Sequence, residues 1–238
     1  MASSSVAAHS SSQEPKKFAP GPILLLGAPG VGKGTQAQEL VVAWGIPHIS
    51  TGDLLRANVS RGTSLGKQAK EIMDRGELVS DDLVNKMVAE RLKESDTTVG
   101  YILDGFPRTL GQADWLDKHL AANPGSLSVI AVSIEVSYNQ LLCRITGRRI
   151  CPVCKSSYNI YLQPPKVDEL CDLDGTPLTR RSDDTEEVFE ERMRAYNSLT
   201  APVVEHYRGL GRFEQVNGEQ PVSAVTAEVM QAVLRLRS

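Results

Sequence analysis

A glycine-rich turn that ends in a lysine carries the clearest chemistry in the sequence. The apolar run 23–26 leads into the loop 27–35, which reads GAPGVGKGT, and a helical pattern continues through Leu40. Glycines let backbone N–H groups wrap a phosphate chain, and the N-terminus of the following helix adds positive potential. Lys33 supplies a mobile charge for the outer phosphates. The order of strand, loop and helix therefore predicts a site for a nucleoside triphosphate, with contacts from Gly30, Val31, Gly32, Lys33, Gly34 and Thr35.

One position of this loop departs from the usual pattern. Gly34 follows the lysine where such loops usually carry Ser or Thr, and the hydroxyl comes one residue later at Thr35. This departure weakens the case for direct coordination of magnesium by the loop. A chance lysine in an ordinary glycine-rich turn is the alternative, which the strand–loop–helix order disfavours.

Several cations lie where such a site would need them. Transfer of a phosphoryl group requires neutralisation of the transferring oxygens and two reactants held in line. The candidates are Lys33, Arg56, Arg108, Arg144, Arg148, Arg181 and Arg192. Any one of them could be a solvated surface charge. Most, however, lie beside glycines, prolines or helix starts at the ends of predicted strands, where a doubly wound sheet binds its ligands.

The remaining patterns predict the elements that must position these side chains. Apolar or β-branched runs predict strands at 23–26, 47–50, 101–104, 129–134 and 213–216. Helical patterns cover 64–75, 80–94, 109–120, a segment through 141–145, a long segment from about 185, with Asp184 as the expected N-cap, and 221–236. Alternation of strands and helices predicts an α/β fold with a parallel sheet.

Between residues 148 and 184 the pattern changes, and cysteines, prolines and glycines gather. Cys151-x2-Cys154, a gap of sixteen residues and Cys171-x2-Asp174 form two pairs at the spacing of metal ligands. Three thiolates and a carboxylate complete a tetrahedral structural zinc site without a water position, and such a site would stabilise a segment too small for its own core. A disulfide, disfavoured in a reducing cytoplasm, and three free thiols are the alternatives.

Two details of the cysteine pattern are also predictions. Asp172 competes with Asp174 as the fourth ligand, and the x2 spacing favours Asp174. Cys143 lies on the apolar face of its predicted helix, so we expect it to be a buried small hydrophobe.

Five motifs together resemble the adenylate kinase family. They are the loop 27–35, STGD at 50–53, LDGFPR at 103–108, ITGRR at 145–149 and RSDD at 181–184, and the resemblance extends over about 22–235. It implies reversible, Mg²⁺-dependent transfer of a phosphoryl group from ATP to AMP, giving two ADP. It also implies a P-loop core over 21–238 with a parallel five-stranded sheet flanked by helices. A helical AMP-binding insert at 50–79 and a small β-rich zinc-bearing lid at 147–184 complete the expected architecture.

The resemblance also assigns roles by matching position. It implies that Lys33, Arg108, Arg148, Arg181 and Arg192 are catalytic, and that ATP further contacts Ser157, Tyr158 and Gln220. The implied AMP contacts are Thr51, Arg56, Glu77, Leu78, Val79, Gly105, Phe106, Pro107, Arg108, Gln112, Arg181 and Arg192. Asp104 would hold Mg²⁺ through water, and Cys-Cys-Cys-Asp zinc lids occur in the family. No general base is needed if an AMP phosphate oxygen is the nucleophile.

Composition limits the other classes of function. The 238 residues are 41% hydrophobic and 23% charged with a net charge of −3, which fits a soluble globular protein and gives no attraction to nucleic acid or anionic membranes. No apolar run approaches the roughly 20 residues that span a bilayer.

The Ser-rich segment 1–20 predicts a disordered tail. It also predicts a cytoplasmic protein, or an organellar one if the segment is a targeting sequence. The resemblance implies a monomer.

The sequence leaves four alternatives to weigh. A nucleoside monophosphate kinase with another acceptor base would share nearly all of the motifs. A P-loop regulatory ATPase or switch would need a protein-docking surface or a guanine-reading Asn-Lys-x-Asp segment, and the sequence has no such segment. A catalytically silent nucleotide-binding module is disfavoured by the intact lysine and arginines. A zinc ribbon for nucleic acid is disfavoured by the acidic residues near the tip of the expected lid.

Overall fold

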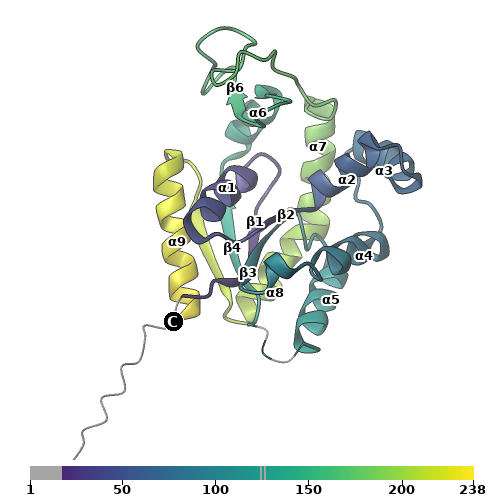
Figure 1. Ribbon diagram of the computed structural model, residues 1–238, viewed down its shortest axis with the longest axis vertical. Helices are drawn as coiled ribbons and strands as arrows, with labels where there is room; N and C mark the ends of the chain where they lie inside the picture. Colours follow the sequence, from purple (N-terminus) through teal and green to yellow (C-terminus); the bar gives the residue numbers. More distant parts are fainter. Residues whose placement is uncertain (1–17, 124, 126) are drawn as a thin grey trace, which may run out of the picture.

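A parallel sheet of five strands forms the centre of the molecule (Figure 1). The computed structural model describes residues 18–123, 125 and 127–238. The strands are β1 (Gly21–Leu26), β2 (His48–Ser50), β3 (Gly100–Asp104), β4 (Ile130–Glu135) and β7 (Phe213–Asn217), in the spatial order β2-β3-β1-β4-β7. All four pairings are parallel. The predicted α/β fold with a parallel five-stranded sheet is therefore confirmed.

Helices cover both faces of this sheet, which explains why β1 is buried along its whole length. Alternate residues of a strand point to opposite faces. Ile23 and Leu25 accordingly pack in one cluster with residues of α1 and α9, whereas Leu24 and Leu26 pack in a second cluster with residues of α5 and α8. The helices around the sheet are α1 (Lys33–Trp44), α5 (Leu110–Ala121), α6 (Tyr138–Thr146), α7 (Glu186–Ala195), α8 (Ala201–Gly209) and α9 (Val222–Arg237).

A group of helices follows β2 and lies to the right in Figure 1. It comprises α2 (Thr51–Ser60), α3 (Ser64–Asp74) and α4 (Asp81–Arg91), with the short helix η1 (Ser95–Thr97) after them. The resemblance implied a helical insert over 50–79, and the structure gives α2 as its first helix. Ser50 both ends β2 and caps α2, since its hydroxyl accepts a hydrogen bond from the Asp53 N–H (3.2 Å). The helix expected over 80–94 ends at Arg91.

The segment between α6 and α7 has little apolar interior. It contains the antiparallel pair β5 (Arg148–Ile150) and β6 (Ser157–Asn159) and lies beyond α6 at the top of Figure 1. Its buried cluster consists of Cys151, Cys171 and Leu178, with Tyr158 packed against them. So small a core cannot by itself offset the loss of chain entropy on folding.

Two predictions from the sequence about this region are wrong. Thr185, not Asp184, caps α7, because its hydroxyl accepts a hydrogen bond from the Val188 N–H (3.3 Å). Cys143 is exposed rather than buried. Leu141 and Ile145 occupy the inward face of α6. Cys143 is two positions after Leu141, so its side chain points about 200° away from that of Leu141.

A π-helical turn, η2 (Tyr196–Thr200), joins α7 to α8.

The two ends of the described chain lie together. The Phe18 and Trp44 rings are 5.8 Å apart, and Arg237 donates to the carbonyls of Pro20 (2.7 Å), Pro22 (2.9 Å) and Ser128 (2.7 Å). Most of the predicted disordered tail, residues 1–17, lies outside the described residues. Across the described part of the chain, none of the helices has the length and apolarity that crossing a membrane requires.

Candidate active site

The glycine-rich loop lies between β1 and α1, at the carboxyl end of the central strand, as the sequence predicted. Gly27, Gly30 and Gly32 have φ angles of 130°, 88° and 102°, which residues with side chains rarely adopt. A Cβ at Gly27 would lie 2.4 Å from the Ile134 carbonyl oxygen. The glycines are therefore required for this close loop, which sits where parallel sheets bind ligands.

Lys33 folds back over its own loop. Its Nζ donates to the carbonyls of Gly27 (2.9 Å) and Ala28 (3.1 Å). Burial lowers the pKa of Lys33 to about 8; Asp104 opposes this shift, and the positive charges of three arginines add to it. Those arginines are Arg108, Arg148 and Arg192. The structure thus brings four of the predicted catalytic cations into one electrostatic cluster.

Two carboxylates hold two of these arginines. Asp184, which is fully buried, accepts from the Arg148 Nε (2.8 Å) and also pairs with its Nη2. Asp183 is buried and pairs with Arg192. Burial raises the pKa of Asp183, but the charges of Arg192 and Arg56 outweigh it, so the pKa lies below its usual range. The sequence placed both aspartates in a motif but gave neither this role.

The other two predicted phosphate arginines meet at one aspartate. Arg56 donates to the Asp53 Oδ1 at 2.6 Å, and Arg181 Nη2 lies 3.9 Å from the same oxygen. Burial, followed by the charges of Arg148 and Arg56, lowers the pKa of Arg181. A guanidinium nevertheless keeps its proton. Residues from α2 and from the segment before α7 are therefore close together here.

Arg108 stands out because it lacks an anionic partner. Its Nε donates to the Gly105 carbonyl (2.8 Å), which also accepts from the Thr51 hydroxyl (2.8 Å). Within residues 18–123, 125 and 127–238, no carboxylate lies within ion-pair distance of Arg108 or Lys33. Asp104 is the nearby negative charge, but neither cation has a carboxylate at ion-pair distance, so an anionic ligand such as a phosphate chain could pair with both.

Asp104, at the end of β3, fits a role beside magnesium. Its Oδ2 accepts from the His48 Nε2 (3.3 Å), whose Nδ1 lies 3.2 Å from the Gln38 amide. Burial raises the pKa of Asp104, but the hydrogen bond from His48 and the charge of Lys33 together hold it below its usual range. The carboxylate is thus ionised and faces the start of α1, since a Cβ at Gly34 would lie 3.7 Å from Oδ2. Sequence reasoning missed His48, which has no motif around it.

Gln112 is buried, and both ends of its carboxamide are bound. Its Oε1 accepts from the Arg108 backbone N–H (2.7 Å), and its Nε2 donates to Asp81 Oδ1 (2.7 Å). Phe106 and Pro107, which precede Arg108, are also buried. The structure therefore brings the acceptor residues predicted at 105–108 and at 112 together, and it adds Asp81.

The segment expected to line a base, residues 77–79, connects α3 to α4. Val79 is buried and Leu78 partly so, whereas Glu77 is exposed and pairs with Arg75 (2.7 Å). Only the backbone of Glu77 is thus available for such a role.

Some predicted ATP contacts lie apart from the cation cluster. Ser157 and Tyr158 are on β6, and the Tyr158 hydroxyl lies 3.4 Å from the Cys171 Sγ. Gln220 is only partly exposed, and it donates to the Asn217 carbonyl (3.0 Å) and the Glu228 carboxylate (2.9 Å). The side chains of Tyr158 and Gln220 therefore have partners other than Lys33, and the contact that the resemblance implies for Gln220 is made by its backbone carbonyl.

Arg144, one of the candidate cations, has a backbone role. It donates to the carbonyls of Val31 (3.0 Å) and Gly218 (2.9 Å). It therefore supports the glycine-rich loop.

The predicted metal ligands converge. One ligand atom from each of Cys151, Cys154, Cys171 and Asp174 lies within 4.8 Å of all the others. Hydrogen bonds from Thr176 lower the pKa of Asp174, so its carboxylate is ionised. Asp172 instead accepts from the Lys166 N–H (2.8 Å). Three sulfurs and one carboxylate oxygen are a donor set that fits Zn²⁺.

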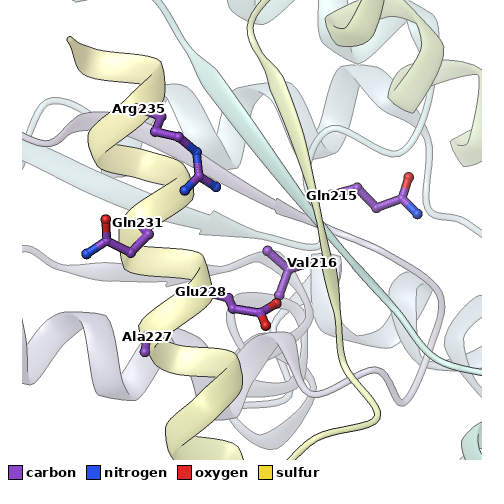
Figure 2. A pocket seen from close by; sticks show the side chains of 6 residues that line it. All are labelled: Gln215, Val216, Ala227, Glu228, Gln231 and Arg235. Atoms are coloured by element: carbon purple, nitrogen blue, oxygen red, sulfur yellow. The ribbon is translucent and has the colours of Figure 1, made fainter.

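A hollow on another part of the molecule contains none of the predicted site residues. It lies between α9 and β7, the edge strand of the sheet (Figure 2). Its lining residues are Gln215, Val216, Ala227, Glu228, Gln231 and Arg235.

Comparisons with known proteins agree on one family. The model of the family described as adenylate kinase matches residues 25–212. A protein named adenylate kinase from Lachnospira eligens is 46% identical over 209 residues, which cover 88% of this chain and 98% of the relative. Proteins of the same name from Nitrosococcus oceani and Petrotoga mobilis are 48% and 49% identical, over 87% of this chain and 96% and 94% of their own lengths. The family that the five motifs predicted is confirmed.

Proposed function

The chain belongs to the adenylate kinase family and is a phosphotransferase that uses ATP and AMP. From this premise we propose which of its residues bind the nucleotides and catalyse the transfer. An oxygen of the AMP phosphate attacks the γ-phosphorus of ATP. The bond from that phosphorus to the bridging oxygen breaks, and two ADP result. No proton has to be removed from the nucleophile, so the reaction needs no general base.

We assign the phosphates of ATP to the loop 30–35 and Lys33, and the phosphate of AMP to Arg108. Arg148, Arg181 and Arg192 neutralise the oxygens between the two nucleotides. Asp183 and Asp184 hold Arg192 and Arg148 in place until the phosphates arrive. Fixed cations of this kind supply most of the catalysis in phosphoryl transfer, because the transition state carries charge on its peripheral oxygens.

We assign AMP to the group of residues after β2 and β3. Thr51, Arg56, the backbone of 77–79, residues 105–107 and Gln112 would surround it. ATP would further contact Ser157, Tyr158 and Gln220, which requires the segment 147–184 to approach the core. Mg²⁺ travels with ATP and neutralises its phosphates, and Asp104 would hold it through water.

We also propose that the cluster of three cysteines and Asp174 holds a structural Zn²⁺. The metal would cross-link the loops of a segment whose apolar core is minimal. A monomeric cytoplasmic enzyme that binds neither nucleic acid nor membranes is part of the proposal. An organellar location is the alternative if the N-terminal segment is a targeting sequence.

The single observation that carries the site assignment is the meeting of Lys33 and Arg108, both without carboxylate partners in the described residues, beside Arg148 and Arg192. The test is the initial rate of transfer from Mg-ATP to AMP, GMP, CMP and UMP, measured side by side. Strong preference for AMP supports the proposal. Faster turnover with another base would retain the mechanism and change the acceptor, whereas ATP binding without transfer to any acceptor would contradict the catalytic assignment.

The pKa of Lys33 leads to a prediction about proton uptake. At pH 8 the free enzyme holds about half a proton on this amine, since its pKa is about 8. Bound phosphates favour the charged form and raise the pKa, so ATP binding at pH 8 should take up about half a proton. Affinity should accordingly fall as the pH rises above 8. Calorimetry in two buffers of different ionisation enthalpy measures the uptake.

Lys33→Arg is the matched control, because a guanidinium stays charged throughout this range. We expect no proton uptake by this variant at pH 8. Equal uptake in both proteins would show that another group titrates.

A further inference from the structure

The carboxamide of Gln112 is held from two sides in one orientation. On one side the Asp81 carboxylate accepts from its Nε2 at 2.7 Å. On the other side the Arg108 backbone N–H donates to its Oε1 at 2.7 Å. A carboxylate can only accept hydrogen bonds and a backbone N–H can only donate. These two neighbours, unlike a hydroxyl or a water, therefore distinguish the two ends of the amide.

A rotation of the amide by 180° would lose both interactions. The amide oxygen would then face the Asp81 carboxylate, and the amide NH₂ would face the Arg108 N–H. Gln112 is 2% exposed, so water cannot replace the lost partners. Leaving buried polar groups unpaired is the costly side of hydrogen bonding. The sequence pattern alone leaves the orientation of Gln112 free, and Asp81 removes that freedom.

Neighbouring residues hold the Asp81 carboxylate in place beside Gln112. Asp81 is the first residue of α4, and its second oxygen accepts from the hydroxyl of Thr109, the N-cap of α5 (2.7 Å). A Cβ at Gly111 would lie 3.1 Å from the Asp81 Oδ2, so the glycine leaves space for the carboxylate. The first residue of α4 thus contacts the start of α5, next to Arg108.

The orientation of an amide decides which purine it can read. An adenine ring offers an acceptor at N1 and a donor at its 6-amino group. A 6-oxopurine, guanine or hypoxanthine, offers a donor at N1 and an acceptor at O6. An amide that can rotate satisfies either pattern, whereas an amide fixed in one orientation satisfies only one of them.

We propose that Asp81 determines purine specificity by fixing the Gln112 carboxamide in the orientation that matches adenine and mismatches 6-oxopurines. The inference rests on the proposed AMP site at Gln112. Asp81 touches no substrate in this account and acts only through the amide. A site whose polar groups are fixed can reject a ligand with the wrong donors far more strongly than a site that adapts.

The test is Asp81→Asn, which keeps the size of the side chain and lets either end of it face Gln112. We expect the ratio of kcat/KM for AMP to that for GMP, and likewise to that for IMP, to fall about tenfold. The Arg108 N–H still favours the original orientation, so the discrimination should fall without vanishing. The ratio is measured on one preparation and does not depend on the fraction of folded protein.

Asp82→Asn is the matched control, because Asp82 is the next residue of α4, is exposed and carries the same charge. Its ratios should equal those of the wild type. A change of equal size in both variants would mean that charge near the N-terminus of α4, and not the contact with Gln112, sets the ratio, and would overturn the proposal.

A second variant separates this inference from the acceptor site itself. Gln112→Leu should lower kcat/KM for AMP about a hundredfold if Gln112 contacts the base. If Gln112→Leu has that effect while Asp81→Asn leaves the ratios unchanged, the role of Asp81 is wrong and the acceptor site stands. If Gln112→Leu leaves AMP unaffected, the assignment of the acceptor site is wrong.

Discussion

Replacing Arg108 by alanine should lower kcat/KM for AMP by about three orders of magnitude while the Kd for ATP changes less than about twofold. The guanidinium is anchored by one bond to the Gly105 carbonyl and has no carboxylate partner among the described residues. A free fork of this kind binds a phosphate through two hydrogen bonds, and the loss of such a contact in a water-poor site costs roughly two to three orders of magnitude in rate.

The location of Arg108 makes the loss selective. It follows β3 and lies next to Gln112 and to Thr51 (through the shared Gly105 carbonyl), two residues that we propose contact AMP. Burial lowers the pKa of Arg108, and the nearby Asp104 opposes this shift. Because the guanidinium is buried and stays charged, water screens its interaction with a bound phosphate only weakly. Initial rates against AMP concentration and ATP binding by calorimetry measure the two effects separately.

Two further variants sharpen this test. Arg108→Lys keeps the charge and loses the fork, and we expect it to recover only part of the loss. Arg91→Ala removes an arginine that is already paired with Asp96 at 2.7 Å, and it should leave both parameters near the wild-type values. Equal losses for AMP and ATP in Arg108→Ala would contradict the assignment of Arg108 to the acceptor.

The sequence predicted those parts of the structure that local patterns specify. The loop 27–35 lies between a buried strand and a helix because apolar periodicity and glycine positions mark both boundaries. The spacing predicted which side chains gather in the cysteine cluster, including Asp174 rather than Asp172. In each case the residues belong to short motifs of fixed spacing, so their chemistry can be predicted without knowledge of the fold.

Contacts between distant parts of the chain were not predictable in this way. The pairing of Asp184 with Arg148 joins residues 36 positions apart, and the pairing of Asp81 with Gln112 joins residues 31 apart. Asp184 was expected to cap α7 because an aspartate before a helical pattern usually does so. Burial beside an arginine outweighed that preference, and Thr185 supplied the cap. Such partner choices depend on tertiary packing, which the local pattern does not contain.

Cys143 shows the same limit for a single side chain. Its helix has two strongly apolar positions, Leu141 and Ile145, and the cysteine was assigned to their face. Only the contacts of α6 with its neighbours decide which side of the helix is covered. The error has a practical use, because an exposed thiol outside the metal cluster is a natural control for experiments on the cysteines.

Removal of the metal should lower Tm by about 10 °C or more and leave measurable phosphoryl transfer at low temperature. The proposed Zn²⁺ replaces the missing apolar core of the segment 147–184, whose buried hydrophobic cluster is limited to Cys151, Cys171 and Leu178. Structural zinc contributes on the order of 10 kcal/mol in small domains. A loss of roughly 3 to 5 kcal/mol already moves Tm by about 10 °C in a protein of this size.

Some activity should survive at low temperature because Lys33, Arg108 and Asp104 lie outside the segment 147–184. Arg148 and Arg181 lie within this segment, so we expect the rate to fall without vanishing. Calorimetric melts before and after chelation, with metal content measured on the same samples, give the result. Cys171→Ser should resemble the metal-free protein, and Cys143→Ser should resemble the wild type because its sulfur lies outside the cluster. A metal-free protein with unchanged Tm would show that hydrogen bonds alone hold this segment, and the structural role of zinc would then be wrong.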